Sequence, residues 1–172
     1  MRGMAPGFNG NARPPGTGVN SPLDAEGRTA LHLAVQKNDT AAMDKLLRVN
    51  ANPNQQDKSG QSPLFAAIEV KNINMVRLLV DKGASFDLRD DKKRTALDWA
   101  IEKECDVEFI ASLKNLGADP NAPALDNRRT AMHLAAEKNR PDLIAYLHSA
   151  GLSLNQQDAN GATPLHIAVA SK

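Results

Sequence analysis

The side chains best suited to chemistry in this sequence are three histidines that recur at matching positions. His32, His133 and His166 lie in similar phrases, "TALHLAV", "TAMHLAA" and "TPLHIAV". Zinc needs three or four ligands that converge on one point, and one histidine in each of several separate segments does not provide them. The matching positions of two further phrases hold Phe65 and Asp98, so no single chemistry is demanded there. We therefore expect these histidines to be structural residues.

No other residue pattern indicates catalysis or a cofactor. A nucleophile needs a base within hydrogen-bond reach, and nothing near the single cysteine, Cys105, suggests one. Gly27, Gly60 and Gly161 stand alone and form no phosphate-binding loop, and a positive φ angle is a sufficient reason for each. We expect a protein that is not an enzyme, with no catalytic, cofactor-binding or metal-binding residues.

Charge and composition narrow the possible partners. Among 172 residues, 21 Lys and Arg balance 20 Asp and Glu, so the net charge is +1 and gives no general attraction to nucleic acid or anionic membrane. Aromatic residues make up 3% of the chain, too few for a base-stacking platform. One cysteine cannot form an internal disulfide, which fits a reducing compartment, and no long apolar run is present. We expect a soluble, intracellular, cytoplasmic protein with no membrane contact.

The elements that position these residues recur along the chain. The Thr or Ser that opens each phrase recurs at intervals of 33, 33, 35 and 33 residues, which indicates a stack of similar units. Thr and Ser are good helix N-caps, and the apolar residues after them form one face of an inner helix. A second, outer helical pattern follows and ends on a residue that tolerates the left-handed conformation. The opening residues are Thr29, Ser62, Thr95, Thr130 and Thr163, and the ends are Asn50, Gly83, Gly117 and Gly151.

Turn-forming stretches join one unit to the next. Segments such as "ANPNQQDKSGQ" predict hairpin-like fingers. The phrases above, with "GADPN" and "DANGATPLH", resemble the ankyrin repeat, whose period and T-P-L-H signature they share. The resemblance covers residues 24–172 and implies an all-α ankyrin-repeat solenoid of stacked helix-turn-helix units joined by β-hairpin-like fingers. The expected units are a flexible Gly/Pro/Asn-rich tail over 1–23, four repeats over 24–56, 57–89, 90–123 and 124–157, and a partial repeat over 158–172.

The resemblance also implies a function. Ankyrin repeats are protein–protein interaction modules without catalysis, which bind a partner through the concave face of fingers and inner helices. An alternative stays open: the chain is the targeting or scaffolding segment of a larger enzyme, channel or secreted effector whose active part lies elsewhere. The expected contact residues are Arg28, Lys37, Lys58, Gln61, Glu69, Arg89, Lys92, Lys93, Arg94, Glu102, Lys103, Asn127, Arg128, Arg129, Glu137 and Lys138.

Departures from the repeat pattern gather in the third and fourth units. Lys93 and Arg128 replace the finger glycine, one residue is inserted near Cys105, and another is inserted between Asn121 and Thr130. Basic residues surround these positions. They form either a solvated, charged edge or a surface that recognises an acidic segment of a partner through bidentate Arg contacts. On either interpretation we expect Arg94 and Arg129 to be exposed.

The fifth unit contains only its inner helix, over roughly 163–170. A solenoid end without a polar cap exposes apolar surface, here at Leu165 and Ile167. We expect further repeats, or another molecule, to cover this end of the stack.

Overall fold

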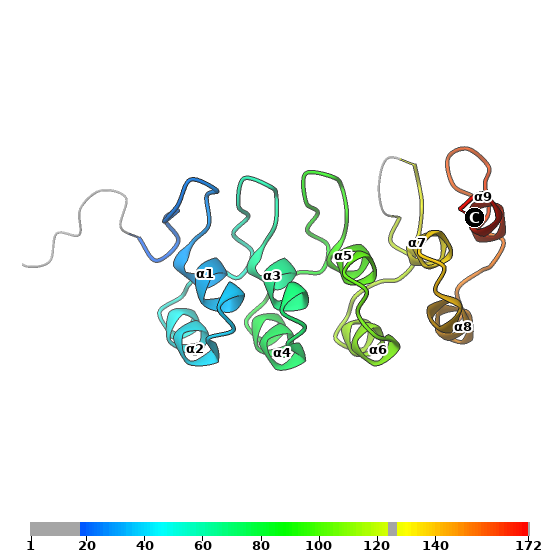
Figure 1. Ribbon diagram of the computed structural model, residues 1–172. Helices are drawn as coiled ribbons and strands as arrows, with labels where there is room; N and C mark the ends of the chain where they lie inside the picture. Colours follow the sequence, from blue (N-terminus) through cyan, green and yellow to red (C-terminus); the bar gives the residue numbers. More distant parts are fainter. Residues whose placement is uncertain (1–17, 124–126, 172) are drawn as a thin grey trace, which may run out of the picture.

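The structure is a row of helix pairs stacked side by side. The computed structural model describes residues 18–123 and 127–171, which contain nine α-helices. Figure 1 shows an inner and an outer row of helices, with the fingers extending from the inner row on one side. The inner helices are α1 (Ala30–Gln36), α3 (Pro63–Glu69), α5 (Ala96–Glu102), α7 (Ala131–Glu137) and α9 (Pro164–Ala170). The outer helices are α2 (Thr40–Arg48), α4 (Ile73–Asp81), α6 (Val107–Asn115) and α8 (Pro141–Ser149). The expected all-α solenoid is confirmed.

The signals read from the sequence set the helix boundaries. Each inner helix begins directly after the expected Thr or Ser, which has the extended backbone of an N-cap. Each outer helix is followed by a residue with positive φ, for example Asn50 at 62° and Gly83 at 87°. Local chemistry therefore determines where the helices start and stop.

The histidines hold one repeat to the next. The backbone N–H of Thr29 donates to Nδ1 of His32 at 3.1 Å, so Nε2 carries the proton and donates to the Gln61 carbonyl at 3.0 Å. His133 makes the same bonds to Thr130 (3.1 Å) and to the Ala162 carbonyl (3.2 Å). Burial lowers the pKa of both rings, which stabilises the neutral form that this bonding needs. These bonds give both histidines the structural role expected of them.

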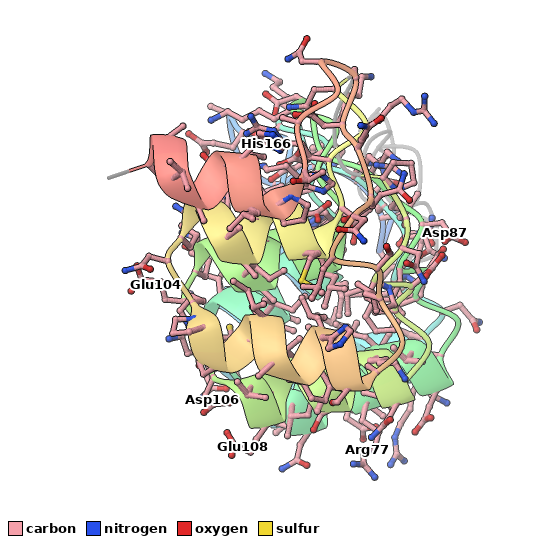
Figure 2. The ribbon with its side chains drawn as sticks, turned by 90° about the vertical axis from the view of Figure 1, so that its right-hand side faces the viewer. Arg77, Asp87, Glu104, Asp106, Glu108 and His166 are labelled. Atoms are coloured by element: carbon pink, nitrogen blue, oxygen red, sulfur yellow. The ribbon has the colours of Figure 1, made fainter. Side chains whose placement is uncertain are left out.

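The core runs through the whole stack. Outer helices contribute pairs of buried residues that face the inner row, such as Met43 and Leu47 on α2 and Met75 and Leu79 on α4. Figure 2 looks along the stack from the α9 end and shows the charged side chains of Arg77 and Glu108 on the outer-helix side, away from that core. Each helix pair thus buries its apolar face against its neighbours.

The insertion near Cys105 and the missing finger glycines lie where the sequence predicts, whereas the second expected insertion, between Asn121 and Thr130, includes residues 124–126, which lie outside the described part of the chain. α1 and α2 begin at Ala30 and Thr40, whereas α5 and α6 begin at Ala96 and Val107, so the pair in the third repeat is one residue further apart. Lys93 and Arg128 keep the left-handed backbone of the glycines they replace, with φ of 62° and 58°. Such a conformation costs a residue with a side chain on the order of 1 kcal/mol.

The first described residues already contact the stack. Val19 is half-buried against the core, and Oδ1 of Asn20 accepts a hydrogen bond from the backbone of Asn52 at 2.6 Å. The N–H of Leu23 donates to the Arg28 carbonyl at 2.7 Å. Residues 18–23 of the expected tail therefore contact the stack, and its residues 1–17 lie outside the described part of the chain.

The last inner helix exposes the residues that its predecessors bury. Leu165 is 71% and Val169 is 67% exposed on α9, whereas their equivalents on α1, Leu31 and Val35, are both 0% exposed. The expectation for Ile167 is wrong: it is 6% exposed because it packs within the stack.

Within residues 18–123 and 127–171, no helix has the length and apolar character needed to cross a membrane. The same part of the chain holds no group of three or more His, Cys, Asp or Glu side chains placed to bind a metal ion.

Candidate partner-binding surface

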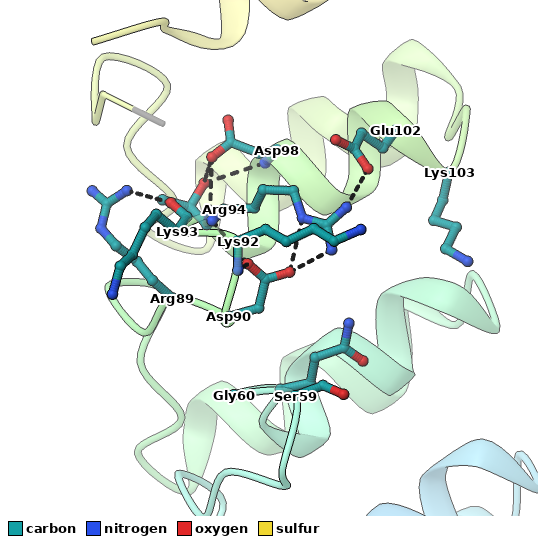
Figure 3. A network of polar contacts seen from close by, with 12 residues as sticks. Ser59, Gly60, Arg89, Asp90, Lys92, Lys93, Arg94, Asp98, Glu102 and Lys103 are labelled. Carbon is teal, nitrogen blue, oxygen red and sulfur yellow. Dashed lines mark hydrogen bonds and ion pairs between the residues drawn. The ribbon is translucent and has the colours of Figure 1, made fainter. Parts of the chain in front are cut away.

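Arg94 is the main correction to the predicted surface. Its side chain is 9% exposed because its guanidinium packs over the ring of Trp99, 4.4 Å from the ring centroid. Nε donates to Oδ2 of Asp90 at 2.8 Å, and a terminal nitrogen pairs with Glu102 at 2.5 Å (Figure 3). Arg94 is therefore a structural residue of the third finger, and the expectation that it is exposed is wrong.

Other finger arginines are also neutralised within the chain. Arg28 pairs with Asp24 at 2.7 Å. Arg129 is only 26% exposed at its side chain and bridges two repeats, with Glu137 at 2.8 Å and the buried carboxylate of Asp158 at 3.3 Å.

Arg89 connects fingers through backbone groups. Its guanidinium donates to the carbonyls of Lys93 (3.0 Å) and Pro123 (2.8 Å). Three of the six basic residues around the third and fourth fingers, Arg89, Arg94 and Arg129, are therefore tied down within the chain.

Four of the predicted cations remain exposed at the tips of the fingers. These fingertip cations are Lys58, Lys92, Lys93 and Arg128. None of them forms an ion pair with another residue in the described part of the chain. Their positive charge is available to a partner.

The fingers that carry these cations are locked together by their backbones. Asp91 donates its N–H to the Ser59 carbonyl at 2.9 Å, and Lys58 donates to the Glu26 carbonyl at 2.9 Å. A Cβ atom at Gly60 would lie 2.8 Å from the backbone nitrogen of Asp91, so glycine is required where these two fingers meet. Lys58, Lys92 and Lys93 are therefore displayed on fingers that are joined to one another through their backbones.

The ends of the inner helices form the second part of the surface. Glu69 on α3 pairs with Lys103, just after α5, at 2.6 Å, and Lys103 also lies 4.6 Å above the Trp99 ring. Phe65 meets the same ring edge-on, with centroids 6.1 Å apart. Cations and carboxylates thus alternate on this surface, and both cations, Arg94 and Lys103, lie against the Trp99 ring.

The sixteen predicted contact residues divide by exposure. The structure brings them to the fingers and inner-helix ends, although not all are accessible. Exposed residues are Lys37, Lys58, Glu69, Lys92, Lys93, Arg128, Glu137 and Lys138. Half-buried residues are Arg28, Gln61, Arg89, Glu102, Lys103, Asn127 and Arg129, and Arg94 is buried.

Trp99 is the residue of this surface that sequence reasoning missed. A signal was present, because it is the only tryptophan and it occupies a position held by Leu33, Ala66 and Leu134 in other repeats. Its indole Nε1 is buried and has no hydrogen-bond partner among the described residues.

Known proteins share this arrangement of repeats. The family described as ankyrin repeats (3 copies) matches residues 31–124 and 109–172. The neurogenic locus notch homolog protein 1 of Danio rerio is 31% identical over 153 residues, which is 88% of this chain and 6% of that protein. Inversin of Canis lupus familiaris is 34% identical over 163 residues (90% and 15%), and the putative palmitoyltransferase ZDHHC13 of Danio rerio is 30% identical over 140 residues (81% and 22%).

The chain thus spans less than a quarter of the length of each of these relatives. The family match covers most of the chain, and the helix pairs, caps and fingers fit it throughout. The chain belongs to the ankyrin-repeat family.

Proposed function

We propose that this chain is a non-catalytic protein-binding module whose fingertip cations contact an acidic segment of a partner protein. Ankyrin repeats are in general protein-interaction modules, and the fingers and inner helices supply the binding face. The proposal of an acidic partner rests on a difference between two sets of cations in the fingers. Finger arginines such as Arg28 and Arg94 are neutralised within the chain, whereas Lys92, Lys93 and Arg128 face solvent with no ion pair to the described residues.

Exposed charges of this kind act mainly on association. They steer an oppositely charged partner over a Debye length of about 8 to 10 Å and contribute little to folding. Binding should therefore weaken as salt rises.

The test compares two charge reversals of equal size. Partners captured from a lysate are identified, and binding is measured for Lys92→Glu with Lys93→Glu and for Arg77→Glu with Lys82→Glu. The second pair is exposed on and just after the outer helix α4, away from the fingers. The fingertip pair should slow association at least about tenfold at low salt, and the outer-helix pair should not. Equal effects of the two pairs, or binding that ignores salt, would contradict the acidic-partner proposal.

The exposed apolar face of α9 supports a further part of this proposal. We expect additional repeats, or another molecule, to cover Leu165 and Val169 in the native protein. Replacing both with Asp should then reduce the stability or assembly of the native protein, measured by thermal unfolding and sedimentation. If neither the melting temperature nor the sedimentation behaviour changes, the proposal that this face of α9 is covered is contradicted.

A second candidate places the module inside a larger protein. The chain matches only a 22% share of a putative palmitoyltransferase, which favours a targeting or scaffolding segment attached to an active part elsewhere. The native protein, captured with an antibody to these repeats and sequenced by mass spectrometry, separates the two candidates, because only the second predicts an active domain in addition to ankyrin repeats.

We also propose an intracellular, cytoplasmic setting for the chain. Cys105 is a buried free cysteine, and a free thiol needs no oxidising compartment.

A further inference from the structure

Two cations lie against the Trp99 ring, and they are held very differently. The guanidinium of Arg94 is 9% exposed at its side chain and bonds to both Asp90 and Glu102. The ammonium of Lys103 is attached through a single ion pair, to Glu69, in which the side chains are 35% and 46% exposed. Arg94 is thus fixed in the structure. Lys103 is half-buried and would lose one partly exposed ion pair and its contact with the ring on leaving, and a second cation in its place would restore both.

Without the Lys103 ammonium, the remaining groups form a receptor for a cation. Tryptophan gives the strongest cation–π attraction of the aromatic residues, and the ammonium lies 4.6 Å from the ring centroid. Glu69 Oε1, from the neighbouring repeat, completes the site at 2.6 Å from that ammonium. The ring and the carboxylate come from adjacent inner helices, α5 and α3, and both belong to the proposed binding face.

We propose that a Lys or Arg side chain of the partner protein binds between Trp99 and Glu69 and displaces the ammonium of Lys103. This inference rests on the proposed function and adds a second recognition element to it. Exposed ion pairs contribute little to stability, so the exchange of one ammonium for another has a low cost. Lys103 acts as an internal occupant that keeps the site filled until a partner competes for it.

The surrounding charges favour a basic side chain over an acidic one. The Arg94 guanidinium also lies over the ring, but it is already paired with Asp90 and Glu102. Once Lys103 has left, Glu69 is the carboxylate without a cation, so an incoming carboxylate would be repelled by it and an incoming cation would be attracted. The fingertip cations that attract an acidic segment are on the finger loops, separate from α5. The partner therefore carries acidic residues for the fingertips and one basic residue for Trp99.

The site occurs once in the array. Positions equivalent to Trp99 hold Leu33, Ala66, Leu134 and Ile167, which have no ring face for a cation. Lys138 occupies in the fourth repeat the place that Lys103 has in the third, and it lies near Leu134. Lys138 therefore provides a matched control.

Trp99 is the only tryptophan in the chain, so its fluorescence reports on this site alone. The probes are N-acetyl-lysine methylamide and, as the acidic counterpart, N-acetyl-glutamate methylamide, titrated at constant ionic strength. The lysine probe should give a saturable change in emission. Lys103→Ala should tighten its binding at least about threefold and Glu69→Gln should weaken it at least about threefold, as expected for single exposed cation contacts. Lys138→Ala should change nothing, and far-UV circular dichroism checks that each variant is folded.

Several results would overturn the inference. A saturable response to the glutamate probe alone would show that Lys103 is drawn away by an acid. Equal affinity of wild type and Lys103→Ala for the lysine probe would show that Lys103 does not occupy its site. The failure of the proposed function is distinguishable, because loss of partner binding on reversal of Lys92 and Lys93 tests the fingertips independently of both probes.

Discussion

Replacing Asp98 with Asn should stabilise the protein at neutral pH. Asp98 lies where three of the other repeats have a histidine, and it is 1% exposed. The N–H and hydroxyl of Thr95 donate to its Oδ2 at 2.8 and 2.6 Å, and an Asn side-chain oxygen can accept both bonds. Burial raises the pKa of this carboxyl from 3.8 to about 6, so at pH 7 the folded chain holds a charge that the solvent would stabilise better.

The size and sign of the effect follow from that pKa. A difference of about two units between folded and unfolded states corresponds to roughly 3 kcal/mol at pH 7. The folded state binds the extra proton, so this cost is absent below about pH 4 and grows as pH rises through 6. Asn removes the cost but also weakens the hydrogen bonds from Thr95, and we therefore expect a gain of ~1 to 3 kcal/mol at pH 7.

The assay is urea unfolding of both proteins at several pH values between 4 and 7.5. The difference in the free energy of unfolding between variant and wild type isolates the effect of Asp98, because the buried histidines titrate in both proteins and their contribution cancels. Asp81→Asn, at an exposed position on α4, serves as the control for loss of one carboxylate. A variant that is no more stable than wild type at pH 7, or a gain that stays constant down to pH 4, would refute the reasoning.

Three further substitutions test the packing. Leu79→Ala, in a fully buried position, should lower the free energy of unfolding in urea by ~2 to 5 kcal/mol. Amide hydrogen exchange should speed up most in repeats one to three. An equal increase in every repeat would contradict a stack in which each repeat is stabilised by its neighbours. Gly60→Ala should destabilise more than Gly161→Ala in thermal melts, because only at Gly60 would the new Cβ meet a backbone atom, the nitrogen of Asp91 at 2.8 Å. Arg94→Ala should lower stability by ~3 to 5 kcal/mol, since it leaves a buried carboxylate unpaired; an unchanged melting temperature would mean that Arg94 is a surface residue after all.

The sequence alone was sufficient for the helices and their order. N-cap residues such as Thr95 and left-handed positions such as Gly83 act within a few residues of the backbone they control. The repeat spacing also located the insertion near Cys105, because one extra residue shifts every later signal. These features are local, and a pattern read along the chain contains them.

The candidate site was only partly predictable for the opposite reason. Fingertip residues such as Lys92 were found because a finger places its tip in solvent whatever surrounds it. Arg94 was assigned to the exposed surface because its buried state depends on Trp99 and Glu102, which reach it only once α5 has folded beside the finger.

Tertiary structure alone decided the chemistry around Trp99 and Asp98. The ion pair that closes the Trp99 site joins Lys103, just after α5, to Glu69 on α3 of the adjacent repeat. The raised pKa of Asp98 arises from burial by the packed stack. Sequence fixes local backbone preferences, whereas the distance between charges and their exclusion from water are set by which repeats pack together.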